Sequence, residues 1–330
     1  MAAEAEGVEL YFHSGFPRPR HLPTGQRYNC AVAITDPWES IPPEKRLEFE
    51  VVREPLEGLS AATIANVERS LPPAITGVVG APPFLVLMTK VAETTFSTIR
   101  YICADKPEDP ARRLSFAVSV PPLVRSLVDQ IYAVVFLGEN VAKRMEWYNK
   151  AGWREIREEY DRHLQRYKGK SADWDSWLTK YSQWLDETQA VLAITPQEAA
   201  APQTIPWWPT PPQMLGLKVL GADNQRFLEY MRDWFYREFS QADHLSFPGL
   251  VRRGAAFLLP PDEERTKNTK MKIKSDWVVH AVVMYLAFLT EVILLGGFDL
   301  KARAAYIWGI LKQYSPIAAE LCQERYDGKL

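Results

Sequence analysis

The pattern of apolar and polar positions changes along the chain near residue 75. Before it, short apolar runs at Val8–Phe12, Tyr28–Ile34 and Leu47–Val51 are separated by prolines, a pattern that predicts short β-strands. From Pro82 onward, apolar residues recur every three to four positions over long segments, as they do along one face of an α-helix. The sequence therefore predicts an all-α protein, a multi-helix bundle with a small irregular or β-containing N-terminal extension.

Prolines at helix starts and glycines after helix ends divide the second part of the chain into elements. A connection over 195–213 is too rich in proline to be helical throughout, and a polar, basic loop is expected over 262–274. We therefore expect an extension over 1–75 and a helical domain over 76–330 that contains the proline-rich connection. The predicted helices span 84–104, 120–137, 140–167, 173–194, 223–242, 248–258, 275–295 and 300–325, and residues 59–70 form a further short helix.

Composition places the chain among soluble globular proteins, with 330 residues, 47% hydrophobic residues, 24% charged residues and a formal net charge of -2. A net charge near zero argues against a protein that coats nucleic acid non-specifically. The three cysteines lack metal-ligand spacing, which favours reduced thiols in the cytosol. The acidic N-terminus lacks the apolar core of a signal peptide, so a cytoplasmic protein is expected.

One segment, 277–298, is long and apolar enough to cross a bilayer. His280 and Glu291 interrupt it, and burying both in lipid would be costly. We therefore interpret it as the central helix of an all-α core and expect no membrane contact. A membrane-associated effector is kept as a third alternative.

Several strong catalytic signatures are absent from the sequence. It contains no phosphate-binding glycine loop, no dinucleotide fingerprint, no His-Glu-x-x-His zinc helix and no nucleophile elbow. The five histidines do not cluster with carboxylates at the spacing of metal ligands. No metal or other cofactor is expected.

The candidate chemistry lies at the end of the predicted helix 223–242, where Arg237 and His244 are seven positions apart. Seven residues are two helical turns, so the two side chains would share one face. Arg237 could bind a phosphate while His244 acts as general acid or base on the 2′-hydroxyl of RNA, without a metal. The alternative is structural: Arg237 pairs with Asp233 or Asp243, and His244 caps the helix.

Further polar residues also have a structural interpretation beside a functional one. Arg125 and Asp129, four apart on an apolar helix, form either an internal ion pair or part of the same cleft as His244. His280 is interpreted as a core histidine, and Glu291 as its partner or that of Arg125.

Three further sequence features have a structural interpretation beside a functional one. A second Arg–His spacing, Arg157 and His163, is interpreted as a solvated helix face. The basic run 265–274 is by default a solvated loop, and Lys267, Lys270, Lys272 and Lys274 are its candidate RNA contacts. An aromatic stripe is interpreted as core or dimer packing rather than a base-stacking platform. The stripe comprises Trp174, Trp177, Tyr181 and Trp184.

Two segments resemble a group of uncharacterised bacterial all-helical proteins related to the HEPN superfamily. One is Leu123–Asp129, a Leu-hydrophobic-Arg-x-hydrophobic-hydrophobic-acidic helix, and the other is Tyr236–His244, a Tyr-x-x-hydrophobic-Ser-x-x-x-His segment. The resemblance covers roughly residues 84–260, and nuclease members of the superfamily carry an Arg followed by four to six residues and a His.

The resemblance implies a metal-independent endoribonuclease of a bacterial toxin or antiviral defence type. Arg237 and His244 would be catalytic, with Arg125, Asp129, Tyr236 and Ser240 in support. RNA would be the substrate, two protomers would form a homodimer, and an antitoxin or other regulatory partner is expected. The alternative is a non-catalytic helical module that binds a nucleotide or a partner protein.

Overall fold

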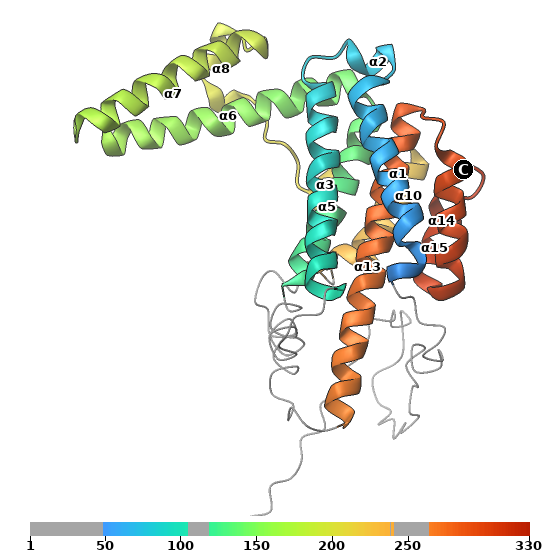
Figure 1. Cartoon of the computed structure of the whole chain (residues 1–330). Helices are drawn as coiled ribbons and strands as arrows, with labels where there is room; N and C mark the ends of the chain where they lie inside the picture. The colour runs from blue at the N-terminus through green and yellow to red at the C-terminus, as the bar shows by residue number, and fades with distance from the viewer. Residues whose placement is uncertain (1–48, 105–118, 238, 241–263) are drawn as a thin grey trace, which may run out of the picture.

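The structure, a computed structural model, describes residues 49–104, 119–237, 239–240 and 264–330, and within these ranges every regular element is a helix (Figure 1). The all-α prediction is therefore confirmed for the described residues, and the strands predicted before residue 47 lie outside them. The elements are α1 Phe49–Arg69, α2 Pro73–Thr76, α3 Ala81–Ala104, α5 Val120–Gly138, α6 Val141–Tyr167, α7 Ala172–Val191, α8 Pro196–Ala200, η2 Pro202–Thr204, α9 Pro211–Gly216, α10 Ala222–Met231, η3 Arg232–Tyr236, α13 Glu264–Gly296, α14 Lys301–Tyr314 and α15 Pro316–Arg325.

The strand predicted over Leu47–Val51 is wrong from Phe49 onward, because α1 begins there. The apolar residues that follow, Val52, Leu56 and Leu59, are fully buried and spaced by four and three positions, which is the helical period. A two-residue alternation over five residues is too short to outweigh it. Helix α1 packs against α3, α13 and α14, so this part of the expected extension belongs to the main core.

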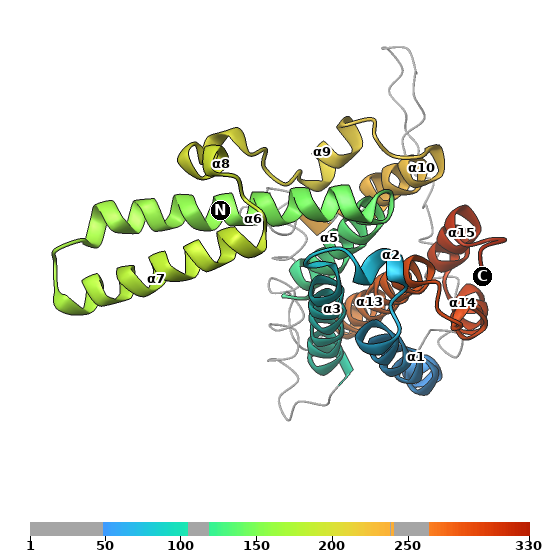
Figure 2. The same cartoon turned by 90° about the horizontal axis from the view of Figure 1, so that it is seen from above.

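Helix α13 forms the centre of the bundle and packs against α5, α3 and α1 (Figures 1 and 2). Residues 281–293 are buried on all sides, which explains why this stretch is apolar all round rather than amphipathic. Glu291, the one acid there, receives two hydrogen bonds of 2.8 Å from Arg325 of α15. The expected partners of Glu291, Arg125 and His280, are therefore corrected to Arg325.

Two helical segments of the described chain, Val120–Gly138 and Trp277–Gly296, have the length and apolar composition of a membrane span. Most of each is buried inside this bundle, 67% and 83% respectively. In the fold, both segments pack against α3, and Val120–Gly138 also packs against α10 and η3.

The basic loop predicted over 262–274 is also wrong, because α13 begins at Glu264. The segment contains no glycine or proline before Gly296, so its helical propensity is uninterrupted although its first turns are polar. Lys267, Lys270, Lys272 and Lys274 thus lie on the helix, and their side chains lie outside the described residues. The helix predicted over 248–258 also lies outside them. The helix predicted over 300–325 is broken at Ser315, where Pro316 starts α15.

Helices α6 and α7 form an antiparallel hairpin that extends away from the bundle (Figures 1 and 2). We call residues 150–191 the arm. The arm has a small core of its own, which includes Trp153, Tyr160, Leu178 and Leu185. Three tryptophans of the predicted stripe stay 39–45% exposed beside this core, so they are not core residues.

Candidate pocket between α5, α9 and η3

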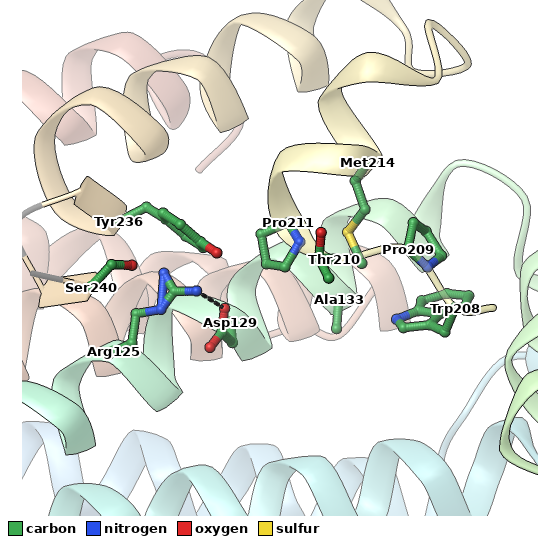
Figure 3. Close-up of a pocket in the computed structure, with 10 residues that line it drawn as sticks. All are labelled: Arg125, Asp129, Ala133, Trp208, Pro209, Thr210, Pro211, Met214, Tyr236 and Ser240. Atoms are coloured by element: carbon green, nitrogen blue, oxygen red, sulfur yellow. Dashed lines mark ion pairs between the residues drawn. The ribbon is translucent and has the colours of Figure 1, made fainter. Parts of the chain in front are cut away.

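A pocket of about 510 Å³ lies where α5, the segment before α9, and η3 meet (Figure 3). A volume of this size is typical of small-molecule sites. Four residues singled out from the sequence line it: Arg125, Asp129, Tyr236 and Ser240. The other lining residues are Ala133, Trp208, Pro209, Thr210, Pro211 and Met214.

Arg125 is the dominant charge of this pocket, and only 8% of the residue is exposed. Its Nη2 lies 2.9 Å from Oδ1 of Asp129, so the ion pair predicted from their spacing is present. The ring of Tyr236 covers the guanidinium, whose carbon lies 3.1 Å from the ring centroid, a cation–π contact. The Nη1 atom is buried and has no hydrogen-bond partner among the described residues. A buried donor without a partner is costly unless a ligand or water satisfies it.

The contact between Tyr236 and Arg125 depends on an irregular turn in the backbone. Helix α10 continues into η3, a π-helical turn in which the N–H of Arg237 donates to the carbonyl oxygen of Arg232, five residues earlier. Such turns insert one residue into an α-helix and are frequent at functional sites. Phe235 stays buried in the bundle while Tyr236 and Ser240, four positions apart, both reach the pocket.

The tyrosine behind the pocket, Tyr132, is buried and uncharged. Tyr132 lies on α5 beneath Tyr236, with ring centroids 5.9 Å apart, and its hydroxyl donates to the carbonyl oxygen of Leu228. Burial raises the pKa of Tyr132 well above its ordinary value, so this hydroxyl stays protonated. Arg125 and Asp129 are consequently the charged groups that face the pocket.

The outer wall of the pocket comes from the proline-rich connection. Trp208 packs edge-on against Phe136, Trp147 and Tyr148, at centroid distances of 5.1–5.7 Å. The indole N–H of Trp147 donates to the carbonyl oxygens of Pro206 and Trp207, both at 3.1 Å. Trp207 itself remains 48% exposed under the guanidinium of Arg154. The connection is thus fixed along α6 and presents residues 208–211 to the pocket.

The sequence predicted that the connection packs against the body, but not that it forms a pocket wall. Residues 208–214 come from a segment without helical period, and their position depends on contacts with residues some sixty positions earlier. The one available indication was the Trp207–Trp208 pair, since two tryptophans in a polar connection predict a packing contact.

The described structure contains only one of the two predicted catalytic residues, Arg237. Arg237 is exposed, does not line the pocket, and forms no ion pair or hydrogen bond through its side chain with any described residue. Asp233, one of its expected partners, is paired with Arg232. His244 and Asp243 lie outside the described residues, so the Arg237–His244 pair stays a prediction.

His163 and His280, the two histidines among the described residues, occupy structural surroundings. His280 packs among the rings of Phe235, Phe239 and Trp277, in keeping with its interpretation as a core histidine. Arg157 pairs with Asp161, and His163 lies against Tyr167 and Trp177 in the arm. Within the described ranges, no group of three His, Cys, Asp or Glu side chains could hold a metal ion.

Comparison of the chain with protein-family models, curated proteins and solved structures found no match. The resemblance to the HEPN superfamily therefore rests on the two motifs alone. What the fold adds is that Arg125 and Asp129 of the first motif lie beside Tyr236 and Ser240 of the second.

Proposed function

We propose that the chain is a helical binding module whose pocket takes a small ligand with an anionic oxygen group, such as the phosphate of a nucleotide. The observation that carries this proposal is the buried Nη1 of Arg125, which has no hydrogen-bond partner within the described part of the chain. Arg125 contacts one carboxylate and one ring, and these contacts leave N–H donors of its guanidinium for a ligand. Oxyanions are the ligands that guanidinium donors bind best.

The rest of the pocket supports a ligand with an apolar or aromatic body. Trp208, Tyr236 and Met214 supply ring and thioether surface, while Thr210 and Ser240 supply hydroxyls. Pockets that are mainly apolar with a few convergent polar groups are typical of small-molecule sites. Asp129 offsets the charge of Arg125, so a single phosphate group suits the site better than a polyphosphate.

The proposal is tested by calorimetric titration with inorganic phosphate and a panel of nucleoside monophosphates. We expect Arg125→Met to weaken the binding of an accepted ligand at least tenfold, because a hydrogen bond to a charged group is worth about 1.5–3 kcal/mol. Arg69→Met, at an exposed position at the end of α1, is the matched control. Equal affinities of wild-type and Arg125→Met protein, with both folded, would contradict the proposal.

A metal-independent endoribonuclease is the second candidate, favoured by Arg237, which is exposed one residue from the pocket wall and pairs with no described residue. Arg237 would hold the scissile phosphate and His244 would transfer the proton. On this proposal the protein is a cytoplasmic toxin or antiviral effector with RNA as substrate, and an antitoxin or regulatory partner would control it.

Incubation of wild-type, Arg237→Ala and His244→Ala proteins with transfer RNA in chelator separates the two candidates. Cleavage that is lost in both variants and retained in Arg69→Ala would support the ribonuclease. Absent cleavage, or equal cleavage by all four proteins, would leave the binding module.

A further inference from the structure

The arm carries a ladder of aromatic rings in which three tryptophans are 39–45% exposed and two tyrosines are half-buried. The rings of Tyr167 and Trp174 are stacked at 4.1 Å, and those of Tyr181 and Trp184 at 5.6 Å. Trp177 joins the two pairs, contacting Trp174 at 5.8 Å and Tyr181 at 5.1 Å. We call these five residues the ladder. Exposed aromatic area of this extent is a hallmark of interaction surfaces.

Beside the ladder, one face of α6 carries acidic residues in one half and basic residues in the other. Glu155, Glu159, Arg162 and Arg166 follow one another by four, three and four positions, so they share one face of α6. All four are exposed, and none forms an ion pair with a described residue. The two acids lie toward the bundle and the two bases toward the tip of the arm.

This face adjoins the ladder. The Arg166 guanidinium lies 5.5 Å from the Tyr167 ring centroid. The charge of Glu159 contributes to a raised pKa of Tyr181, although the main cause is partial burial of the phenol. The charged edge and the aromatic ladder therefore form one surface on the same side of the arm.

We propose that this surface binds a second copy of the chain, with the two arms antiparallel across a two-fold axis. The axis would pass between Tyr160 and Asp161. Glu155 and Arg166 are equidistant from that point, and so are Glu159 and Arg162, so both acids of this face of one α6 would face the two bases of the same face of the other. A parallel arrangement would oppose like charges, which is unfavourable.

The backbone of the arm fits the same axis. Gly152 and Gly169 are also equidistant from it, so the turn at the tip of one arm would lie beside Gly152 of the other. No atom of the described residues lies within 4 Å of where a side chain of Gly152 would be. A glycine inside a helix is unfavourable, and it is tolerated where another backbone approaches closely. The tip would stop short of Asn149, where α6 is bonded to the carbonyl oxygen of Val79 on the bundle.

Other partners fit this surface less well. A nucleic acid would be attracted by Arg162 and Arg166 but repelled by Glu155 and Glu159 on the same face. A partner with a single sign of charge meets the same conflict. Only a partner that is acidic and basic in the reverse order matches, and an inverted second copy supplies that order.

Sedimentation velocity of the full chain over a range of concentrations tests the proposal. We expect a dimer that dissociates more readily at high salt. Glu159→Arg should raise the dissociation constant at least tenfold, and Glu159→Arg combined with Arg162→Glu should restore it. Asp186→Arg is the matched control, because this exposed acid lies about 200° round α7 from Trp184.

The outcomes are distinct. Loss of the dimer in Glu159→Arg and its recovery in the double variant, with unchanged far-ultraviolet circular dichroism, support the proposal. A monomer at all concentrations, or a dimer indifferent to Glu159→Arg, overturns it. A monomer whose tryptophan fluorescence changes with single-stranded RNA overturns it in favour of a nucleic-acid surface.

Discussion

At the scale of single residues, charge inside the bundle is held by specific partners. Arg325 and Glu291 are 6% and 5% exposed in their side chains, and two hydrogen bonds of 2.8 Å join them. The same arginine reaches Asp223, at 3.1 Å, and stacks on the ring of Phe227. This cluster ties the last helix to α13 and α10.

Arg325→Ala is therefore expected to destabilise the protein by about 3–5 kcal/mol, because it leaves the Glu291 carboxylate buried without a counter-charge. Urea unfolding, followed by circular dichroism, measures the loss. The double variant Glu291→Leu and Arg325→Leu removes both charges and should be less destabilised than the single one. Arg303→Ala, at an exposed position of α14, is the control. A loss below about 1 kcal/mol in Arg325→Ala would show that the pair is not isolated from solvent.

Asp223 gives the same cluster a dependence on pH. A hydrogen bond from Lys329 lowers the pKa of Asp223, with smaller contributions from the charges of Lys329, Arg325 and Arg226. Because the folded pKa lies below the unfolded one, this carboxylate stabilises the fold above about pH 4 and stops doing so as pH falls further. Asp223→Asn should flatten the fall in stability between about pH 5 and 2. The check is urea unfolding at a series of pH values, and an unchanged slope would contradict it.

At the scale of elements, the sequence predicted helices wherever the apolar period was long. Helices α3, α5, α6 and α7 begin and end within a few residues of their predicted bounds. The predictions for the starts of α1 and α13 were wrong because the apolar period is missing there. The start of α1 shows a brief two-residue alternation, and the start of α13 is polar, yet both segments continue the helix that follows them.

The pocket was predictable only in part. Spacing placed Arg125 with Asp129, and the resemblance grouped them with Tyr236 and Ser240. The π-helical turn at 232–236 that aims Tyr236 at Arg125 has no sequence signature, because ordinary helix-forming residues adopt it. The wall at 208–211 depends on long-range packing, which local patterns do not encode.

At the scale of the whole molecule, the arm and the pocket share one helix. Helix α6 begins beside the pocket, where Trp147 and Tyr148 hold Trp208, and ends at the tip of the arm. Further out, Lys150 pairs with Glu198, and Arg154 donates to the carbonyl oxygen of Ile205. The connection 196–211 is thus fastened along α6 before it closes the pocket. A change in the tilt of the arm would move the pocket wall with it.

This coupling predicts that Trp147→Phe weakens pocket binding although Trp147 does not line the pocket. The substitution keeps an aromatic ring against Phe136 and Trp208 but removes the N–H that bonds to two carbonyl oxygens of the wall. Since a hydrogen bond contributes about 0.5–1.5 kcal/mol, the affinity of a pocket ligand should fall severalfold. Trp184→Phe, on the exposed ladder, should leave the affinity unchanged. Hydrogen exchange gives a second measurement that needs no ligand: the amide of Thr210, which donates to Oε1 of Gln213, should exchange faster in Trp147→Phe. If its exchange is unaltered, the wall is held by ring packing alone, and the arm and the pocket are independent.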